Sequence, residues 1–210
     1  MAIIKGTTVG IEGTIASVLI EIKNEDFKTI YQTLSDESGK FGLCVPDGVY
    51  PFLTAVRDYG DQYLEYWAQN IPAQQELELY IQIDTLEVYG LHAFTVKGAA
   101  NALSIYFRPM SLEKFKAGEV DIAPVLTESD ITVAVNGQES KIYVVNPVRE
   151  YIGEERKYLS AYLIQSSIPE GIKDWERIDI TICDSEKHIG CATLFRQRYT
   201  GDIHPSKKSV

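Results

Sequence analysis

The sequence has few cysteines and no long apolar run, and its first residues lack the charged-then-apolar layout of a signal peptide. Its three cysteines, Cys44, Cys183 and Cys191, are odd in number and fit neither a disulfide framework nor a zinc motif. We expect buried free thiols in a reducing compartment, although Cys183 facing Cys191 across a hairpin stays open. No segment is apolar over the length that a membrane span needs, which predicts no membrane insertion. As written, the chain is expected to be cytoplasmic, or extracellular if it is a fragment of a secreted protein.

Positive charge is also scarce. The 210 residues include 20 lysines and arginines against 30 aspartates and glutamates, a formal charge of −10. A nucleic-acid or anionic lipid surface requires positive potential, so the sequence predicts no nucleic-acid partner. An acidic surface suits a cationic, neutral or carbohydrate partner, and it equally serves solubility. The oligomeric state is left open.

The three histidines, His92, His188 and His204, show no metal-binding spacing. We therefore predict no metal site and no cofactor. The turn Asp58–Asp61 could offer oxygens to Ca²⁺ but lacks the full ligand series of a calcium loop, so this possibility is left open. No nucleophile motif and no phosphate-binding glycine loop is present, and we predict that the protein is not an enzyme.

The most informative segment runs from Thr33 to Pro51. Asp36–Gly39 predicts a hairpin turn, because glycine adopts positive φ and the acidic side chain can accept hydrogen bonds from nearby backbone. Phe41, Leu43 and Val45 then alternate with smaller residues, which is typical of a strand with two different faces. A further turn at Pro46–Gly48 leads into another strand.

Similar short strands continue along the chain, each bounded by turn residues. Leu77–Ile83 shows clear alternation, Asn136-Gly137 predicts a hairpin, and Asn70–Ala73 is expected to break a strand. Ser111–Gly118 is the one predicted helical turn, with serine at its N-cap and glycine as its terminator. Because no alternation of strand and long helix occurs, the sequence predicts an all-β protein.

The segment from Asp36 to Pro51 resembles the central hairpin of the carboxypeptidase regulatory-like domain, a transthyretin-like sandwich of seven strands. The resemblance covers about residues 3 to 83 and implies a non-catalytic accessory or spacer module, as in bacterial polysaccharide-degrading proteins. We predict a first sandwich domain at 1–83, a second β-sandwich of Ig-like or jelly-roll-like type with one short helix at 84–199, and a disordered tail at 200–210.

Two enzyme families share parts of this pattern. Intradiol dioxygenases have a similar turn, but no histidine follows Pro51 until His92, so their iron ligands are missing. Transthyretin-related hydrolases end in a motif that 198–201 only partly matches, and their early histidines are absent. Neither activity is predicted.

The candidate binding residues are aromatic. Tyr59, Tyr63, Tyr66 and Trp67 surround a segment rich in acidic and amide side chains, and Trp175 is a further candidate. Exposed aromatic rings beside hydrogen-bonding groups suit sugar rings or a peptide. The alternative is that these rings fill the cores or the seam between the domains.

Three functions follow from these observations. The first is a non-catalytic bacterial binding module, with carbohydrate as the ligand and the second sandwich as the reader. The second is a structural or assembly protein that contacts protein partners through sheet edges or apolar patches. The third, less favoured, is an enzyme whose site is assembled from distant loops.

Overall fold

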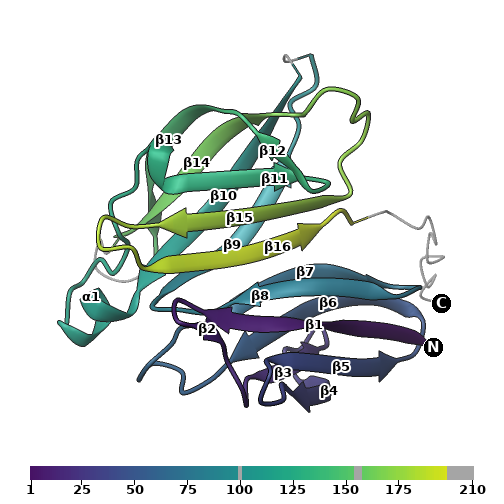
Figure 1. Cartoon of the computed structure of the whole chain (residues 1–210). Helices are drawn as coiled ribbons and strands as arrows, with labels where there is room; N and C mark the ends of the chain where they lie inside the picture. Colours follow the sequence, from purple (N-terminus) through teal and green to yellow (C-terminus); the bar gives the residue numbers. More distant parts are fainter. Residues whose placement is uncertain (99–100, 154–157, 198–210) are drawn as a thin grey trace, which may run out of the picture.

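A computed structural model describes residues 1–98, 101–153 and 158–197 as an all-β protein (Figure 1). This confirms the predicted sandwich class with one short helix, α1 (Leu112–Lys116), to which a 3₁₀ turn, η1 (Glu128–Asp130), is added. None of the helices in these ranges is long and apolar enough to cross a membrane.

The strands of the first half are β1 (Ala2–Gly10), β2 (Gly13–Thr14), β3 (Leu19–Lys23), β4 (Thr29–Leu34), β5 (Lys40–Val45), β6 (Gly48–Val56), β7 (Tyr66–Ala73) and β8 (Leu77–Gln82). Those of the second half are β9 (Leu86–Phe94), β10 (Ala102–Ser111), β11 (Ile131–Val135), β12 (Gln138–Ser140), β13 (Ile142–Tyr151), β14 (Tyr158–Ser167), β15 (Arg177–Cys183) and β16 (Ile189–Phe195).

One sheet runs through both halves. Its order is β12-β11-β15-β16-β7-β6-β3-β4, and the two halves meet where β16 pairs in parallel with β7. A smaller sheet, β2-β1-β5 with β8 paired in parallel to β1, belongs to the first half. Another, β13-β14-β10-β9, belongs to the second. The long sheet is therefore the common frame of the molecule (Figure 1).

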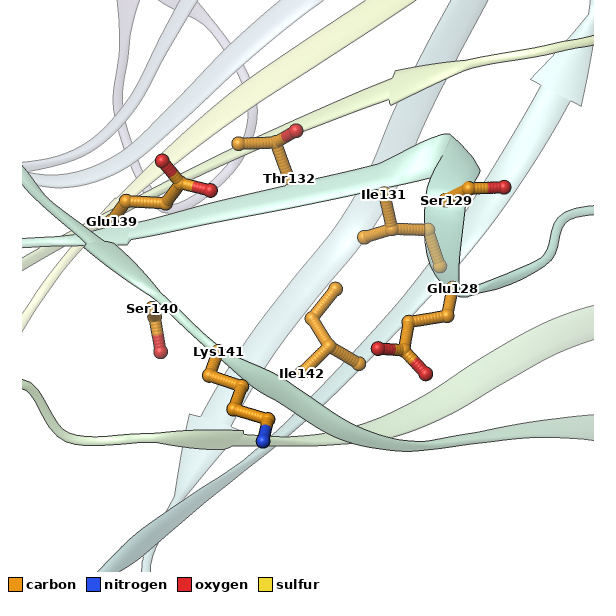
Figure 2. A pocket seen from close by; sticks show the side chains of 8 residues that line it. All are labelled: Glu128, Ser129, Ile131, Thr132, Glu139, Ser140, Lys141 and Ile142. Atoms are coloured by element: carbon orange, nitrogen blue, oxygen red, sulfur yellow. The ribbon is translucent and has the colours of Figure 1, made fainter.

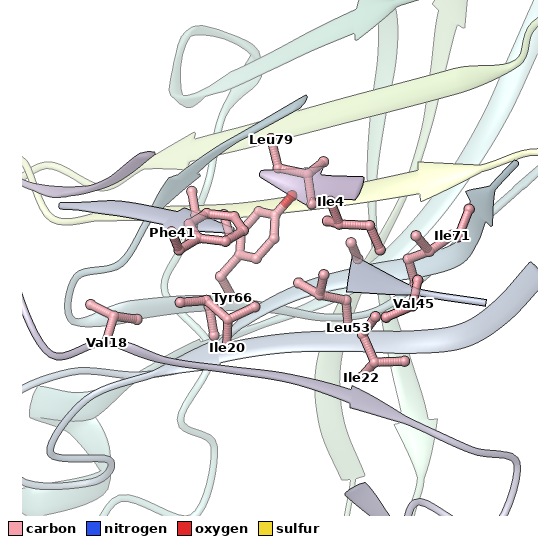
Figure 3. Close-up of a cluster of buried hydrophobic side chains, with 14 of the residues drawn as sticks. Ile4, Val18, Ile20, Ile22, Phe41, Val45, Leu53, Tyr66, Ile71 and Leu79 are labelled. Carbon is pink, nitrogen blue, oxygen red and sulfur yellow. The ribbon is translucent and has the colours of Figure 1, made fainter. Parts of the chain in front are cut away.

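Each small sheet buries a separate core against the long sheet. In the first core, Tyr66 lies among aliphatic side chains that include Ile4, Ile20 and Leu79 (Figure 3). Strand alternation divides β16 between the cores, because Phe195 packs into the first and Leu194 into the second. The small sheets thus cover opposite faces of the long sheet.

The division into domains at 1–83 and 84–199 stays a prediction. The strand β8 supplies the first core and β9 the second, but Phe195 returns to the first core from the far end of the chain. The predicted tail at 200–210 and the motif at 198–201 lie outside the described residues.

The hairpin that dominates the sequence folds as expected. Asp36 Oδ1 accepts hydrogen bonds from the backbone N–H groups of Ser38 (2.9 Å) and Lys40 (2.8 Å). Gly39 adopts a φ of +73°, and its N–H donates to the Asp36 carbonyl at 2.9 Å. The helical turn is also confirmed, with the Ser111 hydroxyl accepting from the Lys114 N–H.

Two local expectations are wrong. Asn70–Ala73 does not break the strand: Asn70 takes a φ of +58° and its amide donates to the Phe195 carbonyl at 3.0 Å, so β7 continues to Ala73. β16 pairs with β7 only at residues 67–69. Pro72 lies beyond this stretch, so β16 does not require a backbone N–H from it. The cysteines are not all buried, because Cys44 is exposed and Cys183 and Cys191 are only partly buried. The possibility that Cys183 faces Cys191 does not hold, because Cys183 lies opposite Ile189.

Gly6 is required by the close approach of β8 to β1. A methyl group at this position would lie 1.9 Å from the Leu79 carbonyl oxygen, whereas one at Gly42 on neighbouring β5 would meet nothing within 4 Å. We expect Gly6→Ala to lower the free energy of unfolding by at least about 2 kcal/mol, because the backbone must move apart. Gly42→Ala, the matched control, should change it by less than about 1 kcal/mol. Equal urea midpoints for the two variants would contradict this packing.

Candidate functional site

A groove of about 350 Å³ lies where the two halves meet. Its residues come from both halves of the chain, since β6 and β7 supply one side and β9, β10 and β13 supply the other. We call it the aromatic groove and define it by Phe52, Trp67, Gln69, Tyr89, Gly90, His92, Tyr106, Arg108 and Glu150. Its volume falls within the range of ligand pockets, about 300–1,000 Å³.

Strand alternation places Trp67 in the groove. Its neighbours Tyr66 and Ala68 point into the first core, so Trp67 and Gln69 lie on the opposite face of β7. There the Trp67 indole Nε1–H donates to Glu87 Oε1 at 2.8 Å, and the Gln69 amide donates to the Leu91 carbonyl at 2.8 Å. Both bonds run from β7 to β9, so they hold the two sides of the groove together.

Three other rings pack around Trp67. Phe27 stacks on it with ring centroids 5.4 Å apart, and Tyr89 meets it edge-on at 5.4 Å. Phe52 makes a second edge contact at 6.3 Å. These are favourable geometries for aromatic pairs, and they hold the indole in one orientation. Tyr89 remains 39% exposed, so part of the aromatic surface faces solvent.

The polar side of the groove is a network around Glu150. One of its oxygens, Oε2, accepts from the Tyr106 hydroxyl at 2.5 Å and from Arg108 Nε at 3.0 Å, with a further bond from the Arg108 guanidinium. The hydrogen bonds from Tyr106 and Arg108 lower the pKa of Glu150. The Arg108 guanidinium also lies 5.4 Å from the centre of the Tyr89 ring. The groove therefore presents fixed charges beside its aromatic rings.

A buried carboxyl group lies beside the groove, on the strand that carries Tyr89. Glu87 is 1% exposed, and besides Trp67 it accepts from the Glu65 N–H at 3.2 Å. Burial raises its pKa to about 7, against two hydrogen bonds that lower it. Burial raises the pKa of Glu65 as well. Glu87 thus titrates near neutral pH while it holds the Trp67 indole.

Of the five aromatic residues predicted from the sequence, Trp67 alone lines the groove. Tyr66 is only 2% exposed, and its hydroxyl donates to Thr193 at 2.7 Å, so it is a core residue without a ligand surface. Tyr63 packs against the first core, Tyr59 is 58% exposed outside the groove, and Trp175 packs against the second core. The structure therefore does not assemble these five into one surface.

Most of the groove residues were not among the candidates predicted from the sequence. Tyr106 and Arg108 belong to a segment that looks like a simple strand end, yet β9 and β10 pair Tyr106 with His92 and Arg108 with Tyr89. Cross-strand pairing of aromatic and charged residues is the signal that could have shown them together. Phe52 and Gln69 could not be linked to these strands without knowing how the halves join.

Other hollows are less suited to a ligand. One of about 520 Å³ has Ile131 and Ile142 at its middle, surrounded by Glu128, Glu139 and Lys141, and no aromatic ring among its lining residues (Figure 2). A wider one of about 730 Å³ contains arginines that already bond acidic partners, Arg177 with Asp179 and Arg196 with Asp174. The aromatic groove combines rings with oriented polar groups.

No protein-family model and no curated protein matches the sequence, so the carboxypeptidase regulatory-like resemblance stays a prediction. Solved structures with partial similarity include a DUF3823 family protein from Bacteroides ovatus, with 9% identity over 94% of this chain and 100% of that one, at a TM-score of 0.29. A candidate carbohydrate-binding protein from Bacteroides uniformis has 8% identity over 93% of this chain and 99% of that one, at a TM-score of 0.31. The major pilin subunit of Bacillus cereus has 12% identity over 92% of this chain and 67% of that one, at a TM-score of 0.29. Similarity this low assigns neither a family nor a function.

The raised pKa of Glu87 predicts a specific pH dependence of stability. Between its ordinary pKa of 4.5 and the folded value of about 7, the folded protein keeps a proton that the unfolded chain has released. Its contribution to stability therefore falls as the pH rises through this window, by about 3 kcal/mol at most. In Glu87→Gln, which cannot ionise, this part of the pH dependence should disappear.

The measurement is urea unfolding from about pH 5 to about pH 8, in which stability should decrease more steeply for the parent protein than for Glu87→Gln. The exposed Glu12→Gln serves as the control and should follow the parent. Parallel curves for the parent and Glu87→Gln would contradict the assignment.

Proposed function

We propose that the protein is a non-catalytic binding module that binds carbohydrate in the aromatic groove. The observation that carries the proposal is the arrangement of Trp67 and Tyr89 beside the Arg108–Glu150 pair. The groove takes its residues from both halves of the chain, so the ligand contacts both rather than the second half alone.

The chemistry of the groove suits sugar rings. A pyranose offers C–H groups on its faces, which pack on aromatic rings, and hydroxyl groups at its rim, which need hydrogen-bonding partners. Trp67, Phe52 and Tyr89 provide the ring surface, and Gln69, His92 and Arg108 provide nitrogen donors at the edges. The network around Glu150 orients Tyr106 and Arg108 before a ligand arrives, which reduces the entropy lost on binding.

The same contacts favour binding over catalysis. Glu150 is held as a carboxylate by Arg108 and Tyr106, so it is poorly suited to donate a proton. Glu87 has a pKa suited to acid–base chemistry, but it is 1% exposed and accepts a hydrogen bond from the Trp67 indole. A general acid must hold a proton near neutral pH and must also reach the reacting group of the substrate. Glu150 does not meet the first condition, and Glu87 does not meet the second.

The assembly alternative is supported by β13, an edge strand that exposes Tyr143 and Val144. The same strand carries Pro147, which has no N–H to donate, and the exposed Asn146 and Arg149. Proline and charge on an edge strand discourage pairing with another sheet. We therefore favour the groove over the edge as the functional surface.

The test is a calorimetric titration with soluble oligosaccharides of glucose, xylose, mannose and N-acetylglucosamine. We expect at least one to bind, and Tyr89→Ala to weaken that binding about tenfold, equivalent to about 1.4 kcal/mol, because one of the three rings of the aromatic surface is removed. Tyr80→Ala is the matched control, since Tyr80 is 64% exposed on β8 and outside the groove.

The proposal fails if none of these sugars binds with a dissociation constant below about 1 mM. It also fails if Tyr89→Ala binds as tightly as the parent, or if Tyr80→Ala loses as much affinity. Far-UV circular dichroism of both variants controls for loss of the fold.

A further inference from the structure

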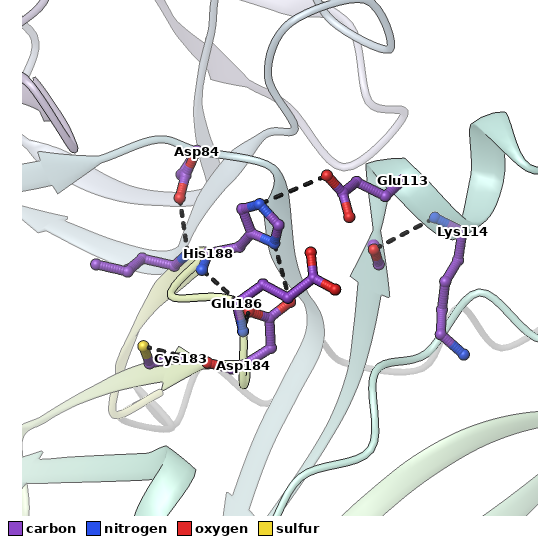
Figure 4. A network of polar contacts seen from close by, with 9 residues as sticks. Asp84, Glu113, Lys114, Cys183, Asp184, Glu186 and His188 are labelled. Atoms are coloured by element: carbon purple, nitrogen blue, oxygen red, sulfur yellow. Dashed lines mark hydrogen bonds and ion pairs between the residues drawn. The ribbon is translucent and has the colours of Figure 1, made fainter.

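A group of metal-binding side chains lies away from the aromatic groove, where the loop between β15 and β16 meets α1. Among the described ranges 1–98, 101–153 and 158–197, one group of three such residues has donor atoms within 4.8 Å of one another: Glu113, Glu186 and His188. Glu113 is in α1, and the other two lie at the end of the β15–β16 hairpin (Figure 4).

The imidazole of His188 is oriented for a cation. Its Nδ1 lies 3.1 Å from Asp184 Oδ2, while Nε2 faces Glu113 Oε1 at 3.6 Å. A histidine that donates Nδ1–H to a carboxylate has its Nε2 lone pair available, which is the usual orientation of a histidine metal ligand. Asp184 holds the loop too, because its other oxygen accepts from the backbone N–H groups of Glu186 and His188 at 3.0 Å each.

The distances fit a small cation after modest side-chain rotation. Ligands of a tetrahedral zinc ion, each about 2.0–2.1 Å from it, are about 3.4 Å apart. His188 Nε2 and Glu113 Oε1 are already near this separation. Both glutamates are exposed and can change rotamer, and a cavity of about 450 Å³ lined in part by Glu113, Asp184 and Glu186 opens beside them. A cation and its remaining water could enter by this path.

The local charge is negative, because the carboxylates outnumber Lys187, the one lysine of the loop at 184–188. Asp184, Glu113 and Glu186 surround one histidine, and Asp84 approaches the same turn, its Oδ2 accepting from the Ile189 N–H at 2.8 Å. The nearby Lys114 is paired with Glu119 at 3.1 Å. A divalent cation would offset this charge. An imidazole in the donor set favours zinc and similar metals over Ca²⁺ and Mg²⁺, which prefer oxygen ligands alone.

We propose that Glu113, Glu186 and His188 form a binding site for a divalent cation of the zinc class, which ties the β15–β16 hairpin to α1. The site is independent of the groove and its ligand. Sequence spacing did not show it, because Glu113 is distant in the chain from the hairpin that carries the other two ligands.

The test is calorimetric titration of metal-free protein with ZnCl₂, with MgCl₂ and CaCl₂ for comparison. It uses the full chain carrying Cys44→Ser and His204→Ala, so that an exposed thiol and a histidine beyond the described residues do not bind zinc. We expect one equivalent of Zn²⁺ to bind and to raise the melting temperature. Glu186→Gln and Glu113→Gln should each weaken binding at least about tenfold.

Glu139→Gln, which changes an exposed glutamate on β12 away from this loop, and His92→Ala are the matched controls and should bind zinc as the parent does. Co²⁺ should give visible absorption bands that are lost in His188→Gln. The proposal is overturned if Zn²⁺ does not bind, if Mg²⁺ or Ca²⁺ binds equally well, or if either control loses as much affinity as Glu186→Gln. Because both glutamates are exposed, their variants test the site even if His188→Gln does not fold.

Discussion

The parallel pairing of β7 with β16 joins the two halves, and the groove depends on it. The pairing is short, Trp67 opposite Ala192 through Gln69 opposite Leu194, but buried polar groups reinforce it. The Tyr66 hydroxyl donates to Thr193, and the Thr193 hydroxyl donates to Asp179 at 2.6 Å. Leaving a buried donor or acceptor of such a hydrogen-bond series without its partner costs free energy. These bonds therefore fix the register between the halves.

This register explains why the groove lies at the seam. The two small sheets cover opposite faces of the long sheet. The face of β6 and β7 that carries Phe52, Trp67 and Gln69 is therefore not covered by the first small sheet, and β9 lies beside it. The second half then forms a wall along that face, with Tyr89 and Arg108. Neither half has the groove without the other, which places the proposed ligand where both contribute.

Local patterns predicted much of the fold, and long-range pairing accounts for what they missed. The hairpin at Asp36–Gly39 and the capped turn at Ser111 follow from nearby residues, and both are confirmed. The pairing of β7 with β16 brings Tyr66 to Thr193, 127 residues later in the chain. Parallel pairing of strands so far apart leaves no pattern in the nearby sequence. Trp67 was therefore found from its aromatic and polar neighbours in the sequence, while the groove residues on β9 and β10 were not.

The most direct test of the central claim is the NMR signal of the tryptophan side chains. The chain has two tryptophans, so its spectrum should contain two indole N–H peaks, which Trp175→Phe assigns. On titration with an oligosaccharide that binds, the account predicts that the Trp67 peak shifts, because its ring lines the groove, while the Trp175 peak stays in place. An unmoved Trp67 peak at saturation would contradict the account.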